Sequence, residues 1–155
     1  MSYFNVRVYG LIINQNNEVL VSDEEEYGVR FSKFPGGGLE FGEGLLDGLK
    51  REFMEECNAE IDILRHFYTT DFFEKSSFND SQLISIYYLV KEKAPLQLAF
   101  KTKVFDFDSE GEILQAFRWV AIKDLVVEDI TFKTDQVVAQ MLKDQFNKKN
   151  GAFLK

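Results

Sequence analysis

Residues 34–59 read FPGGGLEFGEGLLDGLKREFMEECNA, and this stretch decides how the chain can fold. Pro35 ends a strand-like segment, and the three glycines after it let the backbone turn closely. From about Gly44 to Cys57, apolar residues recur at helical spacing with charged residues between them: Leu45, Leu46, Leu49 and Phe53. The stretch therefore predicts a glycine-rich loop that leads into an amphipathic helix.

Three glutamates share one face of this predicted helix. Glu55 and Glu56 follow Glu52 by three and four residues, a spacing that places the carboxylates side by side. Such crowding costs stability unless a cation neutralises it, and hard oxygen ligands select Mg²⁺, Mn²⁺ or Ca²⁺. The alternative is a solvated helix face with ordinary ion pairs, in which Arg51 pairs with Asp47, Glu55 or Glu43, and a bare Arg-Glu-x-x-Glu-Glu favours that alternative.

The complete spacing changes this interpretation, because it resembles the Nudix box. Five residues separate the first glycine of the pattern from its first glutamate, and seven more precede the Arg-Glu pair. So many fixed residue types at fixed distances form a far more specific signal than a lone glycine-rich loop. The positions that match the box are Gly37, Glu43, Arg51, Glu52, Phe53, Glu55, Glu56 and Ala59.

Two positions depart from the family pattern. Asn58 stands where the box has glycine, just after the helix, and we expect it to adopt the left-handed conformation that Asn tolerates. Ser32 stands where many relatives have tryptophan, three residues before Pro35. We expect Asn58 to have little effect on the fold or the activity. Ser32 should affect packing or substrate specificity more than catalysis.

The resemblance implies a fold and a reaction. The implied fold is α+β, with a mixed curved β-sheet sandwiched between helices (α/β/α) and residues 1–155 forming one domain. The implied reaction is Mg²⁺-dependent hydrolysis of a phosphoanhydride bond in a nucleoside diphosphate-X compound, with Mn²⁺ as a second candidate metal. Carried over position by position, the metal ligands are Glu52, Glu55, Glu56 and Gly37.

The resemblance also assigns roles near these ligands. Glu56 or Glu52 helps to activate water, Arg51 orients a glutamate, and Glu43 supports Arg51 from outside the metal site. Four further side chains are candidates for substrate contacts, although a surface charge is the simpler interpretation of each: Arg7, Arg30, Lys33 and Glu112, with Glu110 beside the last as a further acid.

The rest of the chain alternates strand-like and helical patterns. A β-hairpin is predicted from residues 4–14 and 18–22 around an Asn-rich turn, followed by an acidic loop at 23–28 and a short strand at 29–34. Residues 61–73, 83–90 and 116–120 favour strands, residues 91–111 a connection, and 122–126 a helical turn. Residues 134–148 carry apolar residues at helical spacing, with an acidic start and a basic end, and predict a C-terminal helix.

Composition narrows the functional class. The chain has 155 residues, 45% of them hydrophobic, so it can bury a full core. Its formal charge of −8 repels polyanions and speaks against a nucleic-acid polymer as partner. Cys57 is the single cysteine, and no apolar run approaches membrane-spanning length. We therefore expect a cytoplasmic protein without a membrane association. Cys57 itself, and the sole histidine, His66, are expected to be structural.

The substrate is left open among small nucleotides, such as a nucleoside triphosphate, a deoxynucleoside triphosphate or a nucleotide sugar. The chain has no proline between Pro35 and Pro95, which counts against the ADP-ribose type of the family. The competing hypothesis is a Nudix-fold module that binds or senses a nucleotide without hydrolysing it. The presence of every box carboxylate favours the enzyme. A homodimer is compatible with the family and is left open.

Overall fold

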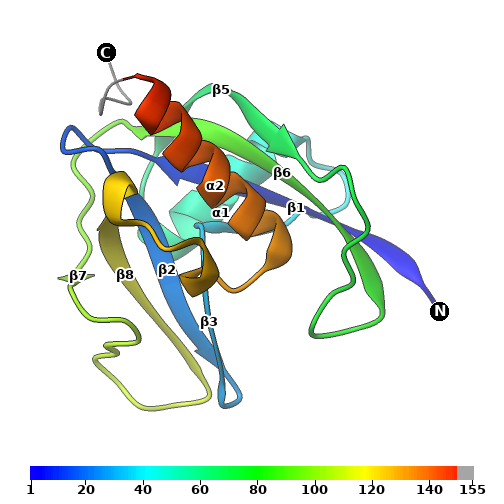
Figure 1. Ribbon diagram of the computed structural model, residues 1–155. Coiled ribbons are helices and arrows are strands. Elements are labelled where there is room, and N and C mark those ends of the chain that lie inside the picture. Colours follow the sequence, from blue (N-terminus) through cyan, green and yellow to red (C-terminus); the bar gives the residue numbers. More distant parts are fainter. Residues whose placement is uncertain (150–155) are drawn as a thin grey trace. The chain divides into compact units, whose positions relative to one another are not determined.

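The computed structural model describes residues 1–149, and the chain divides into two compact units (Figure 1). The first unit contains Met1–Ile12 and Pro35–Gln97, and the second contains Ile13–Phe34 and the chain from Leu98 onward. Each unit has one four-stranded mixed sheet and one long helix. The α+β class with mixed β-structure that the family resemblance implied is confirmed, with the strands divided between two sheets where one was expected.

The first unit holds the glycine-rich loop and the helix after it. Its strands are β1 (Tyr3–Ile12), β4 (Gly36–Gly38), β5 (Ile61–Thr69) and β6 (Ser81–Glu92), in the order β4-β1-β6-β5. β1 runs parallel to β6 over its whole length, and the other pairs are antiparallel. Helix α1 (Leu45–Cys57) packs on this sheet through Phe53, whose ring would lie 2.5 Å from a Cβ on Gly10. Glycine at position 10 thus lets the helix approach the sheet.

The second unit is built around the antiparallel pair β2 (Glu18–Glu26) and β8 (Ile113–Ala121). β3 (Val29–Lys33) pairs with the free side of β2, and β7 (Phe100–Lys101) runs parallel to β8, giving the order β3-β2-β8-β7. Two 3₁₀ turns, η1 (Ile122–Asp124) and η2 (Val127–Asp129), lead to α2 (Lys133–Lys148). The buried face of α2 includes Val138, Ala139 and Leu142.

The predicted hairpin of residues 4–14 and 18–22 is wrong. β1 and β2 belong to different sheets, and only an isolated bridge between Ile13 and Val19 joins the two segments. The Asn-rich turn itself is present, with the Asn14 side chain accepting the N–H groups of Asn16 and Glu18. Local turn chemistry was predicted correctly, but it does not specify which strand becomes the partner.

The predicted acidic loop at residues 23–28 is also wrong, because β2 continues through Glu26. Acidic residues have low strand propensity, yet here cations on neighbouring strands pair with them. Asp23 pairs with Arg118 on β8, and Glu25 pairs with Arg30 on β3. Only Tyr27 and Gly28 form the turn.

The segment 36–38 forms the short strand β4, which was not predicted. Three glycines have little strand propensity, but they pair antiparallel with Arg7, Val8 and Tyr9 of β1. Gly36 has a φ of 142°, and a Cβ there would lie 2.2 Å from the carbonyl oxygen of Val8. Glycine is therefore required for this strand to lie against β1. The helical predictions fared better, since 134–148 corresponds to α2 and 122–126 contains η1.

Candidate active site

Helix α1 is anchored by its apolar side and presents its charged side above β4. Leu49 and Phe53 are fully buried, Cys57 is buried beside them, and Leu45 is half-buried, so the predicted apolar stripe is present. The helix ends at Asn58, whose φ of 48° and ψ of 42° are left-handed, as predicted. The N–H groups of Asn58 and Ala59 donate to the carbonyls of Met54 and Phe53. Asparagine thus fills the position of the expected glycine.

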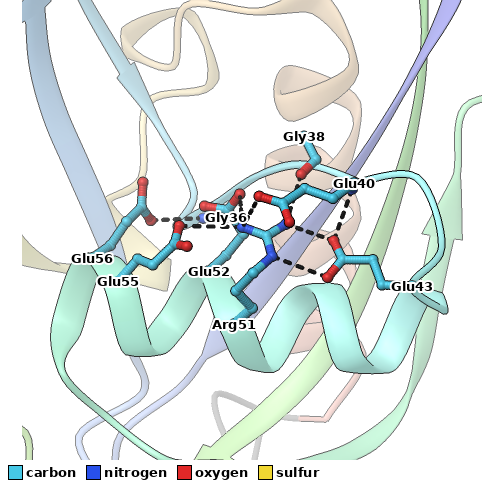
Figure 2. Close-up of polar contacts among 8 residues, drawn as sticks. All are labelled: Gly36, Gly38, Glu40, Glu43, Arg51, Glu52, Glu55 and Glu56. Carbon is cyan, nitrogen blue, oxygen red and sulfur yellow. Dashed lines mark hydrogen bonds and ion pairs between the residues drawn. The ribbon is translucent and has the colours of Figure 1, made fainter.

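Arg51 is the centre of the charged side (Figure 2). Its Nε and Nη2 donate to the two carboxylate oxygens of Glu43 at 3.0 and 2.6 Å, a bidentate pair. Its Nη1 donates to Glu52 at 3.1 Å and to Glu55 at 3.2 Å. Nη2 also donates to the carbonyl oxygen of Gly38 at 3.0 Å. One guanidinium thus joins the start of the box, the glycine-rich strand and two helix glutamates.

These contacts shift the ionisation of both partners of the bidentate pair. The hydrogen bond from Arg51, helped by the backbone N–H of Glu40, lowers the pKa of Glu43 to about 2. The hydrogen bond to Glu43 and the charge of Glu52 raise the pKa of Arg51. Both groups are therefore ionised across the pH range in which proteins work, and Glu43 holds Arg51 in place as a charged pair.

The carboxylate of Glu52 lies directly against Gly37. A Cβ on Gly37 would be 2.7 Å from the carboxyl carbon and from both carboxylate oxygens of Glu52, so any side chain at that position would displace the Glu52 carboxylate. The Glu52 side chain is only 12% exposed. The next turn of the helix repeats the arrangement, because Glu56 accepts the N–H of Gly36 at 3.1 Å. Two glutamates are thus held over two successive glycines of β4.

Glu55 differs from the other two helix glutamates because its side chain is 57% exposed. The carboxylates are spread along the helix, and Arg51 lies among them. In the described part of the chain, no three His, Cys, Asp or Glu side chains stand close enough together to hold a metal ion. The structure does show a surplus of negative charge around Arg51. Its one guanidinium forms ion pairs with four carboxylates, those of Glu40, Glu43, Glu52 and Glu55.

Glu40 and two backbone groups were missed by the sequence reasoning. Glu40 lies 3.6 Å from Arg51, and the N–H of Gly36 and the carbonyl of Gly38 bind Glu56 and Arg51. The signal available was the glycine run itself. Glycines that bring a backbone close to a charged helix face expose N–H and C=O groups for binding.

Arg7 is the candidate for substrate contacts that shares a unit with the box. It pairs in register with Gly38 across β1 and β4, and its Nε donates to the hydroxyl of Tyr9 at 2.5 Å. A Cβ on Gly38 would lie 3.7 Å from the Arg7 guanidinium. Arg7 therefore lies beside the glycine-rich strand, on the face of the sheet toward which a Cβ on Gly38 would point.

The other candidates for substrate contacts belong to the second unit and have partners there. Lys33 was expected to be an exposed charge, but it is buried and pairs with Glu24 at 3.1 Å. Arg30 pairs with Glu25 and lies over the rings of Phe105 and Phe107. The side chains of Glu110 and Glu112 are exposed, and the carbonyl of Glu112 accepts the N–H of Tyr27.

Two further residues singled out from the sequence, His66 and Ser32, have the following surroundings. His66 is exposed on β5, where its Nε2 lies 2.8 Å from the hydroxyl of Thr69. Ser32, in the place of the tryptophan of many relatives, is buried and donates to Asp23 at 2.6 Å.

Comparison with known proteins agrees with this geometry. The model of the NUDIX domain family matches residues 4–141, which include the glycine-rich strand, α1 and the sheets of both units. The chain belongs to the Nudix family. It is therefore a Nudix hydrolase, from a family whose members generally use divalent metal ions and act on small nucleotides. No curated protein sequence matches the chain.

Solved structures share the fold at low sequence identity. The Escherichia coli ORF135 protein is 15% identical with a TM-score of 0.70, covering 98% of this chain and 96% of its own. The MutT protein of Methanosarcina mazei is 19% identical with a TM-score of 0.67, covering 95% and 96%. An ADP-ribose pyrophosphatase of Streptococcus suis is 14% identical with a TM-score of 0.56, covering 91% of both. These similarities establish the Nudix fold of the chain.

The described helices also bear on membrane association. None of the helices within residues 1–149 has the length and hydropathy needed to cross a bilayer.

Proposed function

We propose that this Nudix hydrolase cleaves the phosphoanhydride bond of a small nucleoside diphosphate-X compound, with Mg²⁺ as the metal and Mn²⁺ as a substitute. The observation that carries this proposal is the placement of Glu52 and Glu56 over Gly37 and Gly36. Carboxylates held this way are preorganised beside an open backbone, where a phosphate group can approach.

The donor chemistry of the residues fits a hard divalent cation, and the carboxylates would have to draw together to hold it. Glu52, Glu55 and Glu56, with the carbonyl oxygen of Gly37, form a set of oxygen donors of the kind that Mg²⁺ prefers. The surplus of carboxylates over guanidinium around Arg51 leaves negative charge for a cation to neutralise. When bound, the metal would neutralise the diphosphate and lower the pKa of a water ligand.

The protein groups divide the remaining work. Glu43 fixes the Arg51 guanidinium, and Arg51 fixes the side chains of Glu52 and Glu55 through its Nη1. Glu56 or Glu52 accepts the proton of the attacking water, a role in which a carboxylate contributes through general-base catalysis. Arg7 lies at Gly38 and is the box-side candidate for a phosphate contact, while Arg30, Lys33 and Glu112 remain candidates from the second unit.

The substrate class follows from charge as well as from the site. A formal charge of −8 disfavours a nucleic-acid polymer, whereas a short nucleotide needs only local cations. We propose a nucleoside triphosphate, a deoxynucleoside triphosphate or a nucleotide sugar. We also propose that residues 1–155 act as one catalytic domain in the cytoplasm.

A nucleotide panel tests the proposal. Phosphate and pyrophosphate release is measured with Mg²⁺ or Mn²⁺ for the wild type, for Glu56→Gln and for Glu60→Gln, the last being an exposed glutamate just beyond the helix. We expect turnover of at least one nucleotide by the wild type and by Glu60→Gln, and a loss on the order of 10²-fold for Glu56→Gln.

Two results would contradict it. Full activity in Glu56→Gln would show that the box carboxylates are wrongly assigned. Saturable nucleotide binding without turnover of any member of the panel would favour a sensing module that binds nucleotides and does not hydrolyse them.

A further inference from the structure

The first unit has a hollow of about 450 Å³ where β1 and β6 begin. Tyr3 and Phe4 of β1 pair in register with Ser81 and Gln82 of β6, and all four residues line the hollow. The segment 74–76 runs back along the start of β6, to which a bridge at Gln82 and backbone hydrogen bonds join it. Figure 1 shows both strands beginning near the end of the chain marked N. Two strand ends and the segment before β6 thus frame the hollow.

Three aromatic rings are gathered around this hollow. Tyr3, Phe4 and Phe73 line it, and they are 51%, 67% and 67% exposed. Single exposed apolar residues are common on protein surfaces, whereas several around one hollow form a patch of the kind that marks a binding site. Aromatic side chains bind planar rings by stacking on their faces. The hollow therefore offers a stacking surface to a planar ligand.

The polar groups of the hollow favour a ligand without charge. Lys75 and Asp80 also line it, and they pair with each other at 3.5 Å, so their charges balance. Gln82 is half-buried, and its amide can both donate and accept hydrogen bonds. The volume lies within the range of about 300–1,000 Å³ that is usual for small-molecule sites. A nucleobase matches this chemistry, because it is planar, uncharged and edged with donors and acceptors.

Strand β1 connects the hollow to the glycine-rich strand. Side chains alternate between the two faces of a strand, so Tyr3, Asn5 and Arg7 lie on the same face. A Cβ on Gly38 would lie 3.7 Å from Nη1 of Arg7 and 3.9 Å from Oδ1 of Asn5. The four residues from Tyr3 to Arg7 span about 13 Å, a length that the ribose and phosphates of a nucleotide can bridge. The row of side chains thus leads from the hollow to β4.

We propose that the hollow binds the nucleobase of the substrate, and that the rest of the nucleotide lies along β1 toward the box. The base stacks on the aromatic rings, and its edge forms hydrogen bonds with Gln82. Asn5 contacts the ribose, and Arg7 contacts the phosphate that lies beside Gly38. This inference rests on the proposed function, and it deepens it, because such a site selects nucleoside compounds over diphosphates that lack a base.

The first test measures binding without turnover. AMP, GMP, CMP and UMP have no phosphoanhydride bond, and each is titrated without divalent metal while the backbone amides are followed by NMR. We expect saturable shifts at Tyr3, Phe4 and Phe73 with at least one of the four. Phe73→Ala should raise the Kd on the order of 10-fold, through loss of stacking. The matched control is Phe78→Ala, an exposed phenylalanine nearby in the chain that is not among the residues lining the hollow.

The second test separates binding from chemistry in steady-state kinetics. Phe4→Ala and Phe73→Ala should each raise the KM of the nucleotide substrate on the order of 10-fold and leave kcat unchanged, because stacking on the base is the same in the ground state and the transition state. Gln82→Leu should reduce the differences in KM between nucleotides with different bases. Phe78→Ala should behave as the wild type.

The outcomes distinguish this inference from the proposed function. Turnover that depends on Glu56 but is unaffected by Phe4→Ala and Phe73→Ala would overturn the base site and leave the hydrolysis proposal in place. Binding of a nucleoside monophosphate that depends on Phe73, without turnover of any nucleotide, would support the base site and contradict the proposed reaction. The base site is also overturned if none of the four monophosphates binds, or if Phe78→Ala weakens binding as much as Phe73→Ala.

Discussion

The carboxylates on the charged side of α1 and those at the centre of β2 differ in how they are paired with cations. Around Arg51, four carboxylates contact a single guanidinium, and Glu55 among them is largely exposed. At the centre of β2, Asp23 and Glu24 each pair with a cation: Asp23, 1% exposed, pairs with Arg118, and Glu24 pairs with Lys33. Balanced charge is what a folded interior requires, whereas unbalanced charge at a half-exposed site is available for a ligand.

The hydrogen bonds support this distinction. Asp23 accepts Ser32 Oγ at 2.6 Å, Arg118 Nε at 2.7 Å and the N–H of Phe105 at 3.3 Å. These three hydrogen bonds tie β2, β3, β8 and the loop before β8 together. Glu52 and Glu55 of α1, by contrast, share one donor, the Nη1 of Arg51. The comparison therefore predicts loss of activity from changes on α1 and loss of stability from changes on β2.

The largest effect is expected from Glu52→Gln. The variant keeps the shape of the side chain but removes the charge held against Gly37, so kcat should fall by about 10²- to 10⁴-fold. The midpoint of chemical denaturation should stay the same or rise, because repulsion with Glu55 and Glu56 is relieved. Steady-state kinetics and denaturation curves check both halves. A variant that lost stability in step with its activity would place Glu52 with the structural charges.

Asp23→Asn should behave in the reverse manner. Removing one partner of a buried ion pair costs about 3–5 kcal/mol, so the free energy of unfolding should fall by an amount of that order. Activity per folded molecule should be retained. The control is Glu25→Gln, which removes the exposed pair with Arg30 and should cost at most about 1 kcal/mol. Equal decreases in the free energy of unfolding of the two variants would show that the buried and the exposed ion pair contribute alike, which contradicts the comparison.

Gly37→Ala tests how closely β4 approaches α1. The new methyl group would meet the Glu52 carboxylate at 2.7 Å, so we expect a loss of kcat on the order of 10-fold to 10²-fold. Gly38→Ala is the control, since the nearest atom to a Cβ there is 3.7 Å away. Kinetics of the two variants under saturating metal provide the comparison. Similar losses from both would mean that the glycine run matters for backbone flexibility and not for contact with Glu52.

The smallest effect concerns the end of α1. Asn58→Ala should destabilise the protein by about 1 kcal/mol, because alanine is strained in the left-handed conformation. Asn58→Gly should be neutral or slightly stabilising. Thermal unfolding of both variants measures this, and a tolerated alanine would show that the helix end relaxes to another conformation.

Local features of the sequence predicted local features of the structure. The spacing of apolar residues predicted α1 and α2, and the residue type at position 58 predicted the left-handed helix end. The spacing of the box predicted that Arg51 lies near Glu43. These successes share a cause, because each depends on residues within a few turns of one another or on a family pattern.

What the sequence could not supply was the choice of strand partners. The turn at Asn14 is real, yet β1 pairs with β6, more than seventy residues away, and not with β2. The acidic run of β2 looks like a loop until Arg118, Arg30 and Lys33 are brought to it. The glycines of β4 form a strand only because β1 offers its edge. Each of these depends on a partner distant in sequence, which periodicity does not encode.

Metal titration tests most directly whether the surplus carboxylates of α1 bind a cation. Binding of Mn²⁺ is followed by electron paramagnetic resonance for the wild type, for Glu52→Gln combined with Glu56→Gln, and for a control pair, Glu60→Gln with Asp62→Asn, that removes the same charge outside the site. We predict saturable binding by the wild type and the control, and a loss of affinity of at least about 10-fold in the site variant. Equal affinity in all three proteins, or no saturable binding by the wild type, would contradict the assignment of a metal site to α1.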